Sequence, residues 1–207
     1  MGKRLLPFRQ YNEHDVINMF ALDDSVLSAT ESITGYHSGD AGVFVKVSAG
    51  NLDLDPVSYG TDSYQGKTDY PFVGANQYPK VSLKVTPASA GDVALGITLW
   101  ETAKYDENGE KLLYYPQKAA ENEVLLPGQS VPVATKGVFT VTSRAYDGTL
   151  SVGSKFKLSA NAGKITGAAL SDVSGIGTVL ATGSRGSNGA TIADKFSGTY
   201  AVIRLNA

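Results

Sequence analysis

Short runs of alternating apolar and polar residues recur along the whole chain and predict β-strands. In residues 42–50, GVFVKVSAG, the side chains of Val43, Val45 and Val47 fall on one face, and a Gly-Asn turn follows. The other runs occupy residues 80–85, 92–100, 130–142, 154–158, 176–181 and 200–205. Short spacing between the runs is typical of a β-sandwich or small β-barrel. We therefore expect an all-β protein whose body is a barrel or sandwich, with two small barrels as a variant.

Some segments allow a second interpretation. Residues 13–22 carry apolar residues at helical spacing, yet β-branched Val16 and Ile17 favour a strand. Residues 118–123, KAAENE, are compatible with one helical turn. The Asn108-Gly109 pair predicts a tight turn, and with LLYY at 112–115 it predicts a hairpin. Gly96, inside an apolar run, indicates a bulge or a close backbone contact.

The first residues differ from the rest because basic side chains alternate there with large apolar ones and a proline. Leaving such apolar side chains in water is unfavourable, since full burial of each contributes roughly 1.5–3 kcal/mol. We expect an extended N-terminal arm that docks on a partner surface carrying carboxylates; a disordered tail is the alternative. The expected arm contacts are Arg4, Leu5, Leu6, Phe8, Arg9 and Tyr11.

Two long segments are predicted to be loops. Residues 49–77 are rich in Gly, Ser, Asp and Thr, and residues 182–194 are nearly free of apolar side chains. Tyrosines in and beside the first loop either form a contact surface or cap a barrel end; they are Tyr59, Tyr64, Tyr70 and Tyr78. We divide the chain into three parts: an arm with a first strand (1–22), a β-rich body with the Tyr-rich loop (23–128) and a C-terminal β-barrel half (129–207).

Composition excludes several function classes. The 207 residues carry a net charge of −2, which gives no overall electrostatic footprint for nucleic acid. The chain has no Cys, so disulfides and thiolate metal sites are excluded. No apolar stretch reaches the roughly 18 residues that a membrane-spanning helix needs. The apolar LLPF at the start is too short for the core of a signal peptide, so we expect a soluble protein that is not secreted by that route.

No segment carries a catalytic signature. His37 lies three residues before Asp40, but the chain has no G-x-S-x-G nucleophile turn to accompany it. His14 has Glu13 and Asp15 as neighbours, yet adjacent strand residues point to opposite faces and do not ligate one ion together. The glycines of 183–189 lack the Lys-Ser/Thr of a phosphate-binding loop. We therefore expect no enzymatic activity, no cofactor and no metal site.

Several sequence segments resemble tailed-bacteriophage virion proteins of the head decoration, or cement, type. They are LPFRQYNEHDVINMFAL (6–22), GVFVKV (42–47), ENEVLLPGQSVPVATKGVFTV (121–141), and SGIGTVLATG with TYAVIRL (174–183 and 199–205). The resemblance implies a protein on the outer surface of the virion capsid that binds the major capsid protein and stabilises the head. It also implies a homo-oligomer, with a trimer as one form. The resemblance supplies no counterpart for the Tyr-rich loop and therefore assigns it no role.

A different class remains open. A head-fibre or tail-associated protein that binds a host surface glycan would use the tyrosines as stacking platforms. The sequence does not decide whether the Tyr-rich loop binds capsid, another copy of the chain or a glycan. Neither interpretation requires nucleic acid or a membrane.

Overall fold

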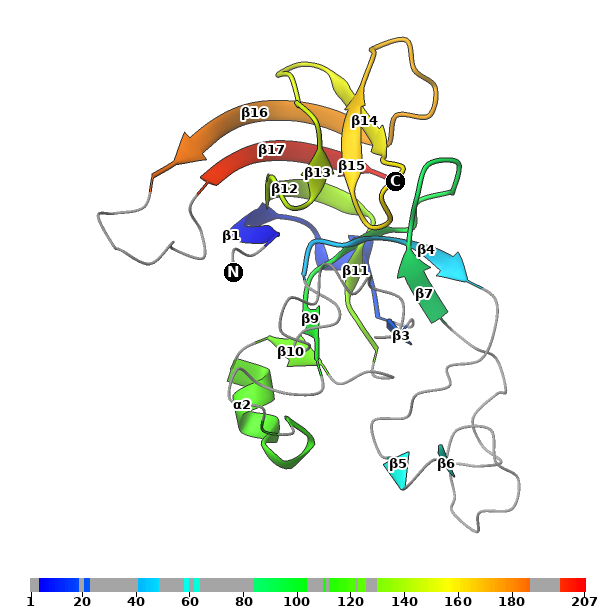
Figure 1. Cartoon of the computed structure of the whole chain (residues 1–207), viewed down its shortest axis with the longest axis vertical. Helices are drawn as coiled ribbons and strands as arrows, with labels where there is room; N and C mark the ends of the chain where they lie inside the picture. The colour runs from blue at the N-terminus through cyan, green and yellow to red at the C-terminus, as the bar shows by residue number, and fades with distance from the viewer. Residues whose placement is uncertain are drawn as a thin grey trace.

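The fold is mostly β, as the alternating pattern predicts (Figure 1). The computed structural model describes residues 4–18, 21–22, 41–48, 58–59, 62–63, 84–103, 110, 112–121, 123–125, 130–186 and 198–207. Within these ranges the helical segments are short: the 3-10 turns η1 (Glu13–Asp15) and η3 (Leu112–Tyr114), and one α-helix, α2 (Pro116–Glu121).

The larger sheet has seven strands, and it contains both the start and the end of the described chain. In spatial order its strands are β1 (Leu5–Gln10), β12 (Lys136–Thr142), β17 (Gly198–Asn206), β16 (Gly177–Arg185), β14 (Lys155–Leu158), β15 (Ile165–Ala168) and β13 (Tyr146–Asp147). Neighbours are antiparallel except β13 and β15. β12 and β13 follow one another in the chain but lie five places apart in this order. The sheet curls, so that Tyr146 of β13 nevertheless contacts Thr199 of β17.

The second sheet has six strands. They run in the order β2 (Val16–Ile17), β11 (Val133–Ala134), β8 (Gly96–Thr98), β4 (Phe44–Ser48), β7 (Lys84–Pro87) and β3 (Ala21–Leu22). Two smaller pairs are β9 (Glu101–Thr102) with β10 (Val124–Leu125), and β5 (Ser58–Tyr59) with β6 (Asp62–Ser63).

In the described ranges no sheet closes into a barrel, so the expectation of one or two small barrels is wrong. The reason lies at the edges of the larger sheet. Among the described strands, β1 pairs with β12 alone, and the two-residue strand β13 pairs with β15 alone. These two edge strands do not hydrogen-bond to each other, which leaves the sheet open.

One hydrophobic cluster joins the two large sheets. Phe44 of β4 and Phe156 of β14 meet edge to face with ring centroids 6.3 Å apart, and Ile97 of β8 belongs to the same cluster. Period-two alternation explains how β14 contributes: Phe156 and Leu158 are buried, while Lys155 and Lys157 reach the surface. The cluster includes residues on both sides of position 128, where the sequence analysis places a boundary.

Several local predictions can be compared directly with the structure. The close contact at Gly96 is confirmed, because a Cβ there would lie 2.2 Å from the Ala134 carbonyl oxygen. The helical turn near 118–123 is present as α2. The strand expected at 112–115 is wrong, since η3 occupies 112–114 and leads directly into the helix. The predicted Asn108-Gly109 turn lies outside the described residues.

Candidate contact surface

The N-terminal segment is an integral strand at the edge of the seven-stranded sheet. β1 pairs with β12 through Leu5 opposite Val141 and Arg9 opposite Phe139, with a shift in register between the two pairs. Pro7 lies within the shifted stretch and has no N–H to donate. Pro and bulges are features that keep an exposed edge strand from pairing with another chain. The segment therefore has a place in its own fold, and the expectation of a free arm is wrong for the described residues.

Half of the expected arm contacts are buried inside this chain. Leu5 and Leu6 belong to the buried core, and Arg4 is 2% exposed. The Nη1 atom of Arg4 donates a hydrogen bond to the carbonyl oxygen of Gly163 at 3.3 Å. These three side chains hold β1 to the body, and a docking partner does not reach them in this conformation.

Arg9 and Tyr11 also have partners in the same chain. Arg9 Nη1 donates to the carbonyl of Leu99 at 3.2 Å, and Nη2 lies 3.1 Å from Glu123 Oε2. Tyr11 stacks on Phe139 with ring centroids 6.0 Å apart. The carboxylate expected on a partner surface is thus supplied by Glu123. Phe8 differs from the others, because 68% of it is exposed.

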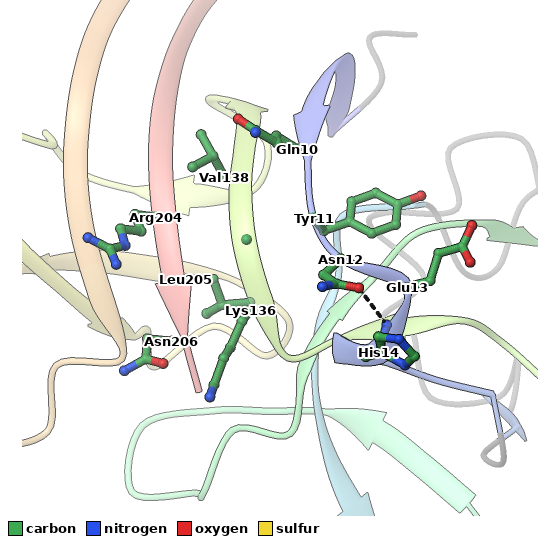
Figure 2. Close-up of a pocket in the computed structure, with 11 residues that line it drawn as sticks. Gln10, Tyr11, Asn12, Glu13, His14, Lys136, Val138, Arg204, Leu205 and Asn206 are labelled. Carbon is green, nitrogen blue, oxygen red and sulfur yellow. Dashed lines mark hydrogen bonds between the residues drawn. The ribbon is translucent and has the colours of Figure 1, made fainter.

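A broad groove of about 750 Å³ begins where β1 ends (Figure 2). It is lined by residues 10–14, by residues 136–138 of β12 and by residues 204–206 of β17. Figure 2 shows Arg204 and Glu13 at opposite sides of the view, while the hydrogen bond from the His14 N–H to Asn12 Oδ1 (3.1 Å) closes the local turn. The ionisable side chains that line this groove therefore do not converge on one point.

No metal centre is built from the described part of the chain. Within it, no group of three or more His, Cys, Asp and Glu side chains has the geometry to hold an ion. In the same ranges, no helix has the length and apolar character needed to cross a membrane. His37 and the tyrosines Tyr64, Tyr70 and Tyr78 lie outside the described residues. Tyr59 lies in β5, opposite Asp62 of β6.

Two surface loops are held by aspartates that sequence reasoning did not identify. In the loop of residues 88–95, Asp92 accepts hydrogen bonds from Ser89 N (2.8 Å) and Ser89 Oγ (3.0 Å), and its other oxygen lies 2.9 Å from Lys46 Nζ. The Lys46 bond, together with the Ser89 N–H, lowers the pKa of Asp92. The carboxylate therefore stays ionised and bonded at neutral pH.

The loop of residues 169–175 repeats this arrangement. Asp172 Oδ2 lies 2.8 Å from Lys157 Nζ, and Oδ1 accepts from Ser174 N (2.9 Å) and Ser174 Oγ (2.6 Å). Lys157 first, and then Ser174, lower the pKa of Asp172 well below its usual range. We call residues 88–95 and 169–175 the pinned loops.

Both pinned loops attach to the β14–β15 hairpin and expose apolar side chains. Ala90 N donates to the Ser159 carbonyl at 2.7 Å, and the 169–175 loop is tied to β14 through Lys157. Val93 is 87% exposed, Leu170 68% and Val173 99%. These are exposed apolar side chains on hydrogen-bonded loops. The sequence gives no local signal for the loop of residues 88–95, because Lys46 and Asp92 lie 46 positions apart.

A second groove, of about 620 Å³, lies between residues 143–150 and the ends of β16 and β17. Tyr146 and Tyr200 line it together with Ser and Thr side chains.

Comparison of the chain with protein-family models, with curated proteins and with solved structures gives no match.

Proposed function

We propose that this chain is a structural protein of a tailed-bacteriophage virion, a capsid decoration (cement) protein that binds the outer surface of the major capsid protein shell. The resemblance of its sequence segments to that class suggests the partner. The observation that carries the proposal is the pair of pinned loops, which present Val93, Leu170 and Val173 to solvent on an ordered frame.

Ordered loops suit this role for a thermodynamic reason. A contact that is already fixed in its bound conformation loses little conformational entropy on association. Each apolar side chain that becomes fully buried contributes roughly 1.5–3 kcal/mol. Because an icosahedral shell repeats each contact many times, modest affinity per copy is enough to stabilise the assembled state.

The structure changes where we place the contact. The sequence pattern places it at the N-terminal residues, whereas Leu5 and Leu6 are part of the core and Arg9 pairs with Glu123. We assign it instead to the pinned loops, with Phe8 as an additional exposed apolar side chain. As finer proposals, the two large sheets pack as a β-sandwich, the protein is non-catalytic, it needs no cofactor, and it forms a homo-oligomer, with a trimer as one form.

Cosedimentation with phage heads that lack this protein tests the proposal. The purified full chain is expected to pellet with the heads, and Val93→Asp and Val173→Asp are expected to weaken binding by about tenfold or more, because each places a charge in an apolar contact. Val152→Asp is the matched control, since Val152 is an exposed turn valine outside the pinned loops. Absence of wild-type binding contradicts the decoration role; wild-type binding that both loop variants retain contradicts the assignment of the contact.

The alternative function, a head-fibre or tail-associated protein that binds a host surface glycan, is favoured by one specific observation. That observation is the groove that Tyr146 and Tyr200 line.

A further inference from the structure

The groove between residues 143–150 and the ends of β16 and β17 has a lining suited to one ligand class. We propose that it binds an uncharged carbohydrate chain. This inference stands on the groove itself and does not depend on capsid binding.

Two tyrosines supply aromatic surface in the groove. Tyr146 lies on β13 and is partly buried against the hydrophobic core, and its hydroxyl group donates to Thr199 Oγ1 at 3.3 Å. Tyr200 lies on β17, directly opposite Gly183 of β16. Both tyrosines are half-buried, and both line the groove. Tyrosine in this setting gives contact area at low entropic cost.

Gly183 permits the position of Tyr200. A Cβ at residue 183 would lie 2.6 Å from the Tyr200 hydroxyl oxygen and 2.7 Å from its Cζ atom. Any other residue at 183 would therefore push the phenol away from the sheet. The Tyr200 phenol therefore lies against β16 at Gly183, and both residues line the groove.

The rest of the lining is rich in hydroxyl groups. They belong to Ser143, Thr149, Thr182, Ser184 and Thr199, all of which are exposed. A hydroxyl group both donates and accepts hydrogen bonds, as the hydroxyl groups of a sugar do. A sugar ring also carries a face of C–H groups, which packs against the electron-rich face of an aromatic ring. Rings and hydroxyl groups in one open groove therefore match both surfaces of a saccharide.

The charge of the groove separates uncharged from acidic sugars. Of the eleven described residues that line it, Asp147 alone is ionised at neutral pH. Its carboxylate accepts from Ser159 Oγ and from Asn161 Nδ2 (2.9 Å), and Lys164 Nζ lies 3.5 Å away. Burial raises the pKa of Asp147, but the hydrogen bonds and Lys164 outweigh that effect and lower it. The charge of Asp147 is thus paired within the chain. None of the eleven described lining residues is Lys or Arg, so the lining has no cation to hold a uronic or sialic acid.

The groove beside β1 provides a contrast. Its lining includes Lys136, Arg204 and Glu13, so its chemistry is that of a charged surface. Both grooves contain tyrosine, but the lining rich in Ser and Thr and without Lys or Arg distinguishes the groove of Tyr146 and Tyr200 from the one beside β1.

Binding of defined hexasaccharides to the full-length protein tests the proposal. The probes are neutral hexasaccharides of glucose, mannose and galactose, and an acidic one of galacturonic acid, measured by titration calorimetry and NMR. At least one neutral probe is expected to bind with Kd of roughly 1 mM or tighter, and the acidic probe at least about tenfold more weakly.

Two variants locate the site. Tyr200→Ala removes a ring, and Thr182→Arg fills the groove from an exposed position without disturbing the core; each is expected to weaken binding by about tenfold or more. Tyr114→Ala is the control, because Tyr114 is a 69% exposed tyrosine outside the groove, and its binding should equal that of the wild type. Thermal unfolding verifies that each variant folds. If Tyr200→Ala does not fold, the binding of Thr182→Arg alone decides whether the groove is the site. The proposal is overturned if no neutral probe binds at about 10 mM, if Thr182→Arg binds as the wild type does, or if the acidic probe binds equally well.

Discussion

Arg9 and Glu123, 114 positions apart in the chain, form an ion pair in which Arg9 Nη2 reaches both carboxylate oxygens, at 3.2 Å and 3.1 Å. The pair ties the edge strand β1 to the segment before β10. Glu123 takes a left-handed backbone conformation, with φ of 54°. The position of β1 is therefore specified by contacts that are remote in sequence.

A double-mutant cycle measures this ion pair. Because half of the Glu123 side chain is in solvent, the coupling between Arg9→Ala and Glu123→Ala should be small, about 0.2–1 kcal/mol. Arg9→Ala alone should cost more than Glu123→Ala, since Arg9 also donates to the Leu99 carbonyl. Urea unfolding of the four proteins gives these values. A coupling free energy of zero would show that the pair contributes nothing to the attachment of β1.

Leu5 and Phe8 test whether β1 belongs to the body. Leu5→Ala should lower the free energy of unfolding by about 2–5 kcal/mol, because Leu5 is a buried core residue. Phe8→Ala on the same strand should change it by less than about 0.5 kcal/mol, since Phe8 is mostly exposed. Denaturant unfolding compares the two. Equal, small effects would favour the extended docking arm that the sequence pattern predicts.

Gly96 and Gly186 allow a matched comparison of a glycine in close contact with backbone and a glycine in open space. Gly96→Ala places a Cβ against the Ala134 carbonyl and should destabilise the fold by about 1–3 kcal/mol or more. At Gly186 a Cβ meets nothing within 4 Å, so Gly186→Ala should be close to neutral. Thermal unfolding distinguishes the two outcomes, and a neutral Gly96→Ala would argue against the pairing of β8 with β11.

The aspartates of the pinned loops predict how stability depends on pH. Asp92 and Asp172 have lowered pKa values in the folded state, so their ionised forms favour folding. This contribution is complete above the unfolded-state value of about 3.9 and is lost as the pH falls below it. Asp172→Asn should therefore lower the unfolding temperature at pH 7 and show a smaller further loss between about pH 5 and pH 2.5 than the wild type. Parallel pH profiles for the two proteins would contradict this assignment.

Local pattern predicts the strands of this protein better than it predicts their partners. Phe156 and Leu158 alternate with lysines, and the structure buries both. In β4 the alternation holds less well, because Phe44 is buried together with Val43 and Val45, while Val47 of the predicted buried face is exposed. The strand role of residues 5–10 was missed because Pro7 and the register shift interrupt the period-two pattern. Its partner, β12, begins at Lys136, and no local signal indicates a pairing across that separation.

The candidate sites depend still more on distant contacts. Lys46 fixes Asp92, and Tyr200 lies over Gly183, yet in the sequence each is an isolated residue without a motif. The tyrosines that the sequence does make conspicuous, Tyr64, Tyr70 and Tyr78, lie outside the described residues. Residue types alone therefore led to the hypothesis of a binding protein, whereas the surfaces that we propose for it required the fold.

The proposed function requires that a phage genome carries this reading frame. Immunogold electron microscopy of the purified virions of that phage tests the proposal most directly. Antibody raised against the purified chain should label the outside of each head with many gold particles, because a decoration protein occupies repeated positions on the shell. Labelling confined to the tail, or virions without label beside a positive blot of the infected lysate, would contradict the proposal of a capsid decoration protein.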